Sequence, residues 1–122
     1  MSLEFYNRVA YHDYEGIALS KAEKKRLVAD LGSKPVMILR NHGLLVMGTT
    51  IAEAFNICYW VETACKAQID AMASGTPLVY PAEEVRQKTA HLYDPSVRRR
   101  FGDMEWDAML RLLDRTDPSF RS

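Results

Sequence analysis

Short apolar runs lie in the first half of the chain, whereas the second half is dominated by helical periodicity. Residues 36–39 (VMIL) and 44–47 (LLVM) are apolar runs on either side of the turn residues 40–43 (RNHG). This pattern predicts two buried strands joined by a tight hairpin. Residues 8–14 (RVAYHDY) predict another strand that ends by Gly16. The strand signal therefore amounts to about three strands.

The longest periodic segment predicts a helix from about residue 51 to residue 74. Thr50 and Glu53 form a capping box at its start, and residues 75–77 (GTP) end it. Apolar residues recur along it at steps of three and four, which predicts one continuous apolar stripe facing a core. The residues of the stripe are Ile51, Ala54, Phe55, Cys58, Val61, Cys65, Ile69 and Met72.

Shorter helices are predicted on both sides of this segment. Ser20 and Glu23 form a second capping box, and the helix that follows is expected to bury Leu27, Val28 and Leu31. Residues 81–91 predict a further helix, residues 94–95 (DP) start another, and residues 106–113 make a final amphipathic helix. The expected fold is α/β, with a small sheet of about three strands packed by four or five helices. Three strands leave at least one sheet edge unpaired, so the chain resembles part of a larger unit.

Composition and charge exclude several classes of protein. The chain has 122 residues, 48% of them hydrophobic, which predicts a single domain over residues 1–122. Sixteen basic residues balance sixteen acidic ones, so no overall charge indicates nucleic acid or a membrane surface as a partner. The basic run 98–100 is interpreted as a solvated or salt-bridged face. No apolar run exceeds five residues, and the first residues lack a signal-peptide pattern, so a cytoplasmic protein is expected. Cys58 and Cys65, the only cysteines, match no zinc-site spacing and are predicted to be buried and reduced.

His42, in the predicted turn, has two interpretations. In the first, Gly43 takes a positive φ, Asn41 tolerates left-handed geometry, and His42 simply occupies a turn position. In the second, the strand ends fix the imidazole as a metal ligand or general base. Zinc needs three or four ligands, and the chain offers only His12 and His91 as further histidines. His91 is expected to interact with a helix dipole, and His12 lies either near the site or half-buried in its strand, so the local sequence alone does not predict a metal site.

The segments "ILRNHGLLVMGTTIAEAF" and "VETACKAQIDAMA" resemble the class II aldolase/adducin family, and "VAYHDYEGIALS" and "LLDRTDPSFR" resemble its adducin-like bacterial branch. The resemblance implies an α/β/α fold, of which this chain would form a part. It also implies that His42 is one of three zinc-binding histidines, while Asn41, Gly43 and Gly48 are structural residues of the turn and of the strand end. The family's other two ligands form a His-x-His pair that precedes this region, as does its catalytic acidic residue, and neither has a counterpart here. The resemblance therefore implies the C-terminal part of a longer domain, inactive as this chain alone, with no catalytic or substrate-binding residue assigned.

Two kinds of function follow from the resemblance. The first is a zinc-dependent lyase that acts on small sugar phosphates or hydroxy-carbonyl compounds, although relatives that catalyse epimerisation or dehydration leave the reaction open. The alternative is an adducin-like, non-catalytic interaction or assembly protein with partners of the actin–spectrin type. The family also implies a homo-oligomer, and Trp60, which lies off the apolar stripe, is a candidate interface residue. Residues 48–50 (GTT) lie where a phosphate could bind a helix start, but two capping threonines explain them equally well.

Overall fold

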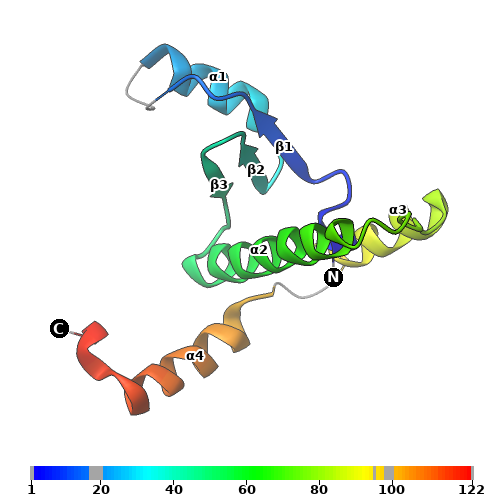
Figure 1. Ribbon diagram of the computed structural model, residues 1–122. Helices are drawn as coiled ribbons and strands as arrows, with labels where there is room; N and C mark the ends of the chain where they lie inside the picture. Colours follow the sequence, from blue (N-terminus) through cyan, green and yellow to red (C-terminus); the bar gives the residue numbers. More distant parts are fainter. Residues whose placement is uncertain (1, 17–20, 95, 98–100, 122) are drawn as a thin grey trace.

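The computed structural model describes residues 2–16, 21–94, 96–97 and 101–121, which form an α/β fold (Figure 1). The described part contains one three-stranded sheet and four α-helices, so the predicted fold class is confirmed. In chain order the elements are η1 (Ser2–Phe5), β1 (Val9–His12), α1 (Lys21–Leu31), β2 (Val36–Leu39), β3 (Gly43–Val46), α2 (Ile51–Ala73), α3 (Glu83–Leu92), α4 (Asp103–Thr116) and η2 (Pro118–Arg121).

The sheet has the strand order β1-β2-β3. β1 runs parallel to β2, with His12 opposite Leu39, and α1 is the crossover that connects them. β3 returns antiparallel to β2, with Gly43 opposite Leu39, which confirms the predicted hairpin. Because β1 and β2 are parallel, their carboxyl ends meet at the same end of the sheet. His12 and the hairpin turn are thereby brought together.

Two apolar clusters cover the opposite faces of the sheet. Val36 and Met37 are both fully buried, and successive residues of a strand point to opposite faces. Val36 packs with Phe5 of η1 and Val61 of α2, whereas Met37 packs with Leu31 of α1. Figure 1 accordingly shows the sheet between α1 and α2, with α4 beyond α2 on the side away from the sheet. The result is an α/β/α arrangement that α4 extends by a further layer.

α2 forms as predicted, but its apolar stripe is not buried along its whole length. Thr50 caps the helix by accepting a hydrogen bond from the backbone N–H of Glu53. Val61, in the middle of the helix, is only 2% exposed, whereas Ile51 and Ile69 near its ends are 77% and 66% exposed. The sheet is narrow and reaches only the central turns of this 23-residue helix. The continuous core face predicted from periodicity is therefore wrong at both ends of the helix.

Three further expectations need correction. Cys58 is exposed, and Cys65 is only half-buried although it packs against the core cluster of Phe5, Val36 and Val61. Val28 is 72% exposed, since α1 turns Leu31 rather than Val28 toward the sheet. No helix begins at Asp94: the described residues of 94–102 form turns, and α4 starts at Asp103.

Some sequence predictions fall on positions that the structure does not describe. These are the capping residue Ser20, Pro95 and the basic run 98–100. Among the described helices, none is both long enough and apolar enough to cross a membrane.

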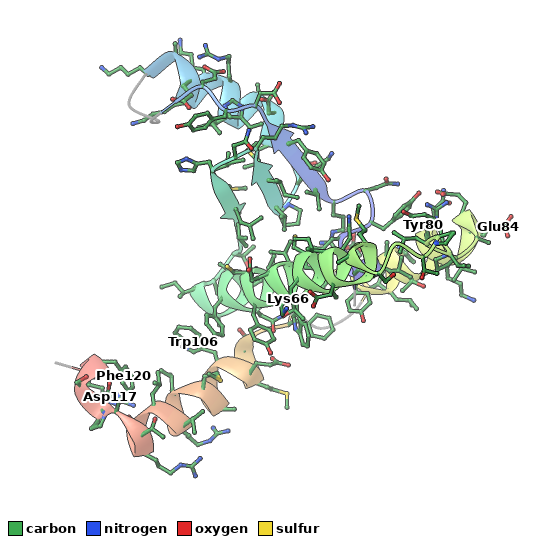
Figure 2. The ribbon with its side chains drawn as sticks, in the orientation of Figure 1. Lys66, Tyr80, Glu84, Trp106, Asp117 and Phe120 are labelled. Atoms are coloured by element: carbon green, nitrogen blue, oxygen red, sulfur yellow. The ribbon has the colours of Figure 1, made fainter. Side chains whose placement is uncertain are left out.

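The two C-terminal helices dock at different places. The Tyr6 hydroxyl donates a hydrogen bond of 2.7 Å to the Glu83 carboxylate, which ties η1 to the start of α3. α4 instead packs on α2, where Trp106 meets Phe55 edge to face at 5.4 Å (Figure 2). Gly102, just before α4, lies so close to α2 that a Cβ there would come within 2.4 Å of the Ala52 carbonyl oxygen. Glycine is therefore needed at this helix–helix contact.

Candidate functional site

The hairpin turn holds His42 at the carboxyl end of β2. Asn41 takes the left-handed conformation, with φ +56°, and the His42 backbone N–H donates a hydrogen bond of 3.0 Å to the Leu39 carbonyl. Gly43 does not have a positive φ and already pairs with Leu39 as the first residue of β3. The left-handed geometry expected at Gly43 therefore belongs to Asn41, which can adopt it because a short polar side chain tolerates this region.

Gly48 serves the turn from β3 into α2. A Cβ at this position would lie 2.5 Å from the backbone nitrogen of Ala54, so only glycine fits between the strand end and the helix. The neighbouring Thr49 donates its hydroxyl to the Glu53 carboxylate at 2.7 Å, while Thr50 caps α2. The hydroxyls of both threonines thus form hydrogen bonds that stabilise the start of α2. These bonds explain the two threonines without a bound phosphate.

The His42 ring is exposed, but it lies against a second aromatic ring. Tyr14, which follows β1, stacks on it with ring centroids 6.1 Å apart and an interplanar angle of 27°. Beside the pair, Arg40 forms an ion pair of 2.9 Å with Asp13 and lies over the ring of Tyr11. Tyr14 therefore flanks one face of the imidazole, while the His42 side chain stays exposed.

His12, at the end of β1, is buried next to this turn. The residue is only 5% exposed, and Nδ1 lies 2.7 Å from Oδ2 of Asp30, on α1. Nε2 has no hydrogen-bond partner among the residues that the structure describes, and the nearest carboxylate oxygen, on Glu15, is 3.9 Å away. The backbone carbonyl of His12 accepts a hydrogen bond from the Arg40 N–H at 3.0 Å. Sequence reasoning left the place of His12 open, and it did not identify Asp30 as its partner.

A small cavity of about 30 Å³ lies between these residues. The side chains that surround it include His12, Tyr14, Glu15, Glu23, Arg40 and His42. Glu15 is bound by the guanidinium of Arg26, and this hydrogen bond lowers the pKa of the carboxyl. The structure thus brings His12 and His42 to one cavity, while His91 lies elsewhere, exposed in the last turn of α3.

The donor set does not complete a zinc site within this chain. Among the described residues, no group of three histidine, cysteine, aspartate or glutamate side chains could hold a metal ion. Zinc sites require at least three protein ligands, and one or two imidazoles fall short of that number. Any tightly bound zinc at His42 would therefore need ligands from outside the described residues.

Trp60, the candidate interface residue, is half-buried. It packs against the core cluster around Val61 and meets Tyr59 edge to face at 5.0 Å. It also lines a groove of about 440 Å³ between α2 and α4, together with Phe55 and Met109. Trp60 therefore contributes both to the core and to an accessible apolar groove.

The sequence of this chain is similar to known proteins. The sequence profile described as "Class II Aldolase and Adducin N-terminal domain" matches residues 1–69, more than half of the chain. The chain belongs to the class II aldolase/adducin family. A "Putative aldolase class 2 protein" of Caulobacter vibrioides is 40% identical over 119 residues, which cover 98% of this chain and 46% of that protein. An adducin-related protein of Schizosaccharomyces pombe is 33% identical, covering 93% of this chain and 37% of that protein.

Solved structures of class II aldolase/adducin relatives have the same fold. An aldolase II superfamily protein from Pseudomonas syringae is 43% identical with a TM-score of 0.86, covering 99% of this chain and 49% of that one. An L-fuculose 1-phosphate aldolase from Glaciozyma antarctica has a TM-score of 0.73 at 24% identity, covering 93% of this chain and 43% of the aldolase, and this likeness concerns the fold alone. The chain spans about half the length of the first curated relatives it matches.

Proposed function

We propose that this chain forms the C-terminal part of a zinc-dependent class II aldolase-type lyase, in which His42 is a metal ligand. The substrate class would be small sugar phosphates or hydroxy-carbonyl compounds. The observation that carries the proposal is the position of His42, which is held at the carboxyl end of β2 by a fixed turn and by Tyr14, with its ring exposed. An imidazole presented in this way loses little freedom when it binds a metal. Membership of the family supports the same role.

The remaining ligands would come from a segment outside these 122 residues, in the form of the His-x-His pair that the family resemblance implies. Two features support a larger parent domain. β1 and β3 each have one edge without a strand partner in the described part, and α2 exposes large apolar side chains near both ends. Zinc at such a site would act as a Lewis acid that stabilises negative charge developing on a substrate oxygen. The 122-residue chain by itself is expected to be inactive.

A homo-oligomeric, cytoplasmic protein is part of the same proposal. The groove between α2 and α4 presents Phe55, Tyr59 and Trp60, whose aromatic side chains suit a subunit contact. The alternative function is an adducin-like interaction or assembly protein without catalysis, with actin–spectrin-type partners. That alternative is favoured by the adducin-related relatives, at 33% identity for the protein of Schizosaccharomyces pombe.

The first test is to sequence the coding DNA upstream of residue 1 in frame and to express the longer protein that it encodes. We expect one zinc per chain by elemental analysis, lost in His42→Ala but retained in His91→Ala, where the replaced histidine is exposed on α3. The 122-residue chain should bind zinc only weakly, because its described residues provide no group of three ligands. Lyase activity is then assayed with a panel of sugar phosphates.

Two results would contradict the metal-site proposal. An upstream frame without a His-x-His pair would leave His42 as a turn residue and would favour the interaction role. Stoichiometric zinc that survives His42→Ala in the longer protein would place the metal at another site.

A further inference from the structure

The buried ring of His12 presents one nitrogen to the cavity beside His42. Its Nδ1 edge faces Asp30 at 2.7 Å, and Asp30 is not among the residues that surround the cavity. Its Nε2 edge lies on the side of Glu15, which does border the cavity. His12 is only 5% exposed and its Nε2 has no partner among the described residues, so this nitrogen is a buried polar atom beside the cavity. Buried polar atoms of this kind normally have a hydrogen-bond partner.

Asp30 determines what kind of partner Nε2 can take. A carboxylate only accepts hydrogen bonds, so in the neutral ring it holds the proton on Nδ1 and leaves the Nε2 lone pair free. The same carboxylate fixes the orientation of the ring. Nε2 is then a hydrogen-bond acceptor, and the group that satisfies it must be a donor. Glu15 cannot be that donor, because its carboxylate is already bound by Arg26 and lies 3.9 Å from Nε2.

The size and charge of the cavity select the donor. A volume of about 30 Å³ accommodates one or two groups the size of a water molecule, which means a hydroxyl group rather than a whole sugar ring. The charged groups around it have partners: Arg40 pairs with Asp13, Glu15 pairs with Arg26, and Glu23 interacts electrostatically with the same Arg26. A phosphate would find no unpaired cation in this described set, and an ammonium group would find no unpaired carboxylate there. A neutral hydroxyl meets the requirement of Nε2 at the lowest electrostatic cost.

We propose that His12 Nε2 accepts a hydrogen bond from a hydroxyl group of a small hydroxy-carbonyl ligand, so that the cavity is a hydroxyl-binding subsite next to His42. Tyr14, stacked on His42, forms the wall shared by the two positions. Asp30 is a positioning residue, since it acts on the ligand only through the His12 ring. The choice of a hydroxy-carbonyl ligand rests on the proposed function, whereas the acceptor role of His12 rests on the cavity alone.

Nuclear magnetic resonance of the imidazole nitrogens tests the proposal on the 122-residue chain. Long-range ¹H–¹⁵N correlation spectra at about pH 8, where histidine rings are ordinarily neutral, report the protonation of each ring nitrogen. The His12 signals are assigned by their loss in His12→Gln, and His91→Gln serves as the matched control. The probe is dihydroxyacetone, with acetone as the control ligand that keeps the carbonyl but lacks the hydroxyls, and EDTA keeps the sample free of metal.

We expect His12 to be protonated on Nδ1 and its Nε2 signal to shift saturably with dihydroxyacetone but not with acetone. The shift of the neighbouring Tyr14 signals should require at least about fivefold more dihydroxyacetone in His12→Gln, because one hydrogen bond is lost. Asp30→Asn should disturb the Nδ1 tautomer and weaken the response, while His91→Gln leaves it unchanged. An Nε2 signal that carries the proton, or one that does not respond to dihydroxyacetone in the wild-type chain, would overturn the proposal even if His12→Gln failed to fold.

The outcome is separable from that of the proposed function. Because EDTA is present, a response at His12 establishes the subsite even if the longer protein binds no zinc. Conversely, the longer protein could bind zinc through His42 while the His12 signals do not respond to dihydroxyacetone. That result would reject the subsite but support the metal role of His42.

Discussion

Replacing Asn41 by alanine should destabilise the hairpin that carries His42, whereas Gly43→Ala should not. Asn41 has φ +56°, a conformation that costs an L-residue about 1–2 kcal/mol and that asparagine tolerates better than alanine. Gly43 does not have a positive φ, and a Cβ there would meet no described atom within 4 Å. We therefore expect Asn41→Ala to lower the free energy of unfolding by about 1 kcal/mol, and Gly43→Ala to change it by about 0.5 kcal/mol or less.

The assay is urea-induced unfolding of the 122-residue chain, followed by circular dichroism, with Asn41→Gly as the matched control. Glycine adopts positive φ without steric cost, so Asn41→Gly should remain closer to wild type than Asn41→Ala. Hydrogen exchange of the His42 N–H, which bonds the Leu39 carbonyl, gives a local readout, and it should accelerate about fivefold in Asn41→Ala. If Gly43→Ala proved the more damaging change, the turn would have its left-handed residue at Gly43 and the geometry described above would be refuted.

Two further predictions concern the docking of the C-terminal helices. Gly102→Ala should lower the free energy of unfolding by about 1–3 kcal/mol more than Gly16→Ala does. Both positions have strongly positive φ (+111° and +101°), but only a Cβ at Gly102 would clash with the Ala52 backbone. Equal losses in urea titrations would contradict this prediction. The hydrogen bond between Tyr6 and Glu83 lowers the pKa of Glu83 and raises that of Tyr6. The stabilisation that this hydrogen bond provides should be fully present above pH 4.5, the ordinary pKa of glutamate, and be lost as pH falls through the lowered pKa of Glu83. It should also be lost as pH rises through the pKa of Tyr6, which lies above the ordinary value of 10.0. In urea titrations across this pH range, Tyr6→Phe should remove the alkaline dependence and reduce the acid one, because Gln87 and Arg86 also lower the pKa of Glu83. An unchanged profile would show that this bond does not hold α3.

Local sequence signals identified most of the elements, though not the absence of a helix at Asp94, and they did not identify the buried faces. The hairpin and α2 are specified by apolar runs, turn residues and the Thr50 cap, all of which act over a few residues. Whether a side chain on a helix is buried depends on which element packs against that face of the helix. Val28 and Cys58 occupy plausible core positions in their helices, yet they are exposed because the three-stranded sheet does not reach them. Periodicity identifies a face of a helix, and only tertiary packing decides whether another layer covers it.

The candidate site shows the same division between local and long-range information. His42 could be singled out from the sequence because Asn41 and Gly43 mark the turn beside it. The pairing of His12 with Asp30 could not be predicted from the sequence, because Asp30 lies on α1 and meets His12 only through the fold of the β1–α1–β2 crossover. A histidine at the end of a strand followed by a crossover helix with a carboxylate in its last turn was the available signal, and it is a weak one.

The parallel pairing of β1 and β2 explains where the candidate site lies in the sheet. Parallel strands place their carboxyl ends at one end of the sheet, and this is where α/β proteins usually bind ligands. His12 follows this rule from β1, and His42 follows it from the turn after β2. A further strand that pairs with β1 in the parallel sense would bring its own carboxyl end to the same end of the sheet. The proposed function requires further ligands to reach His42 at this end of the sheet, because the described residues provide no group of three. The zinc measurement on the longer protein tests whether residues outside these 122 supply them.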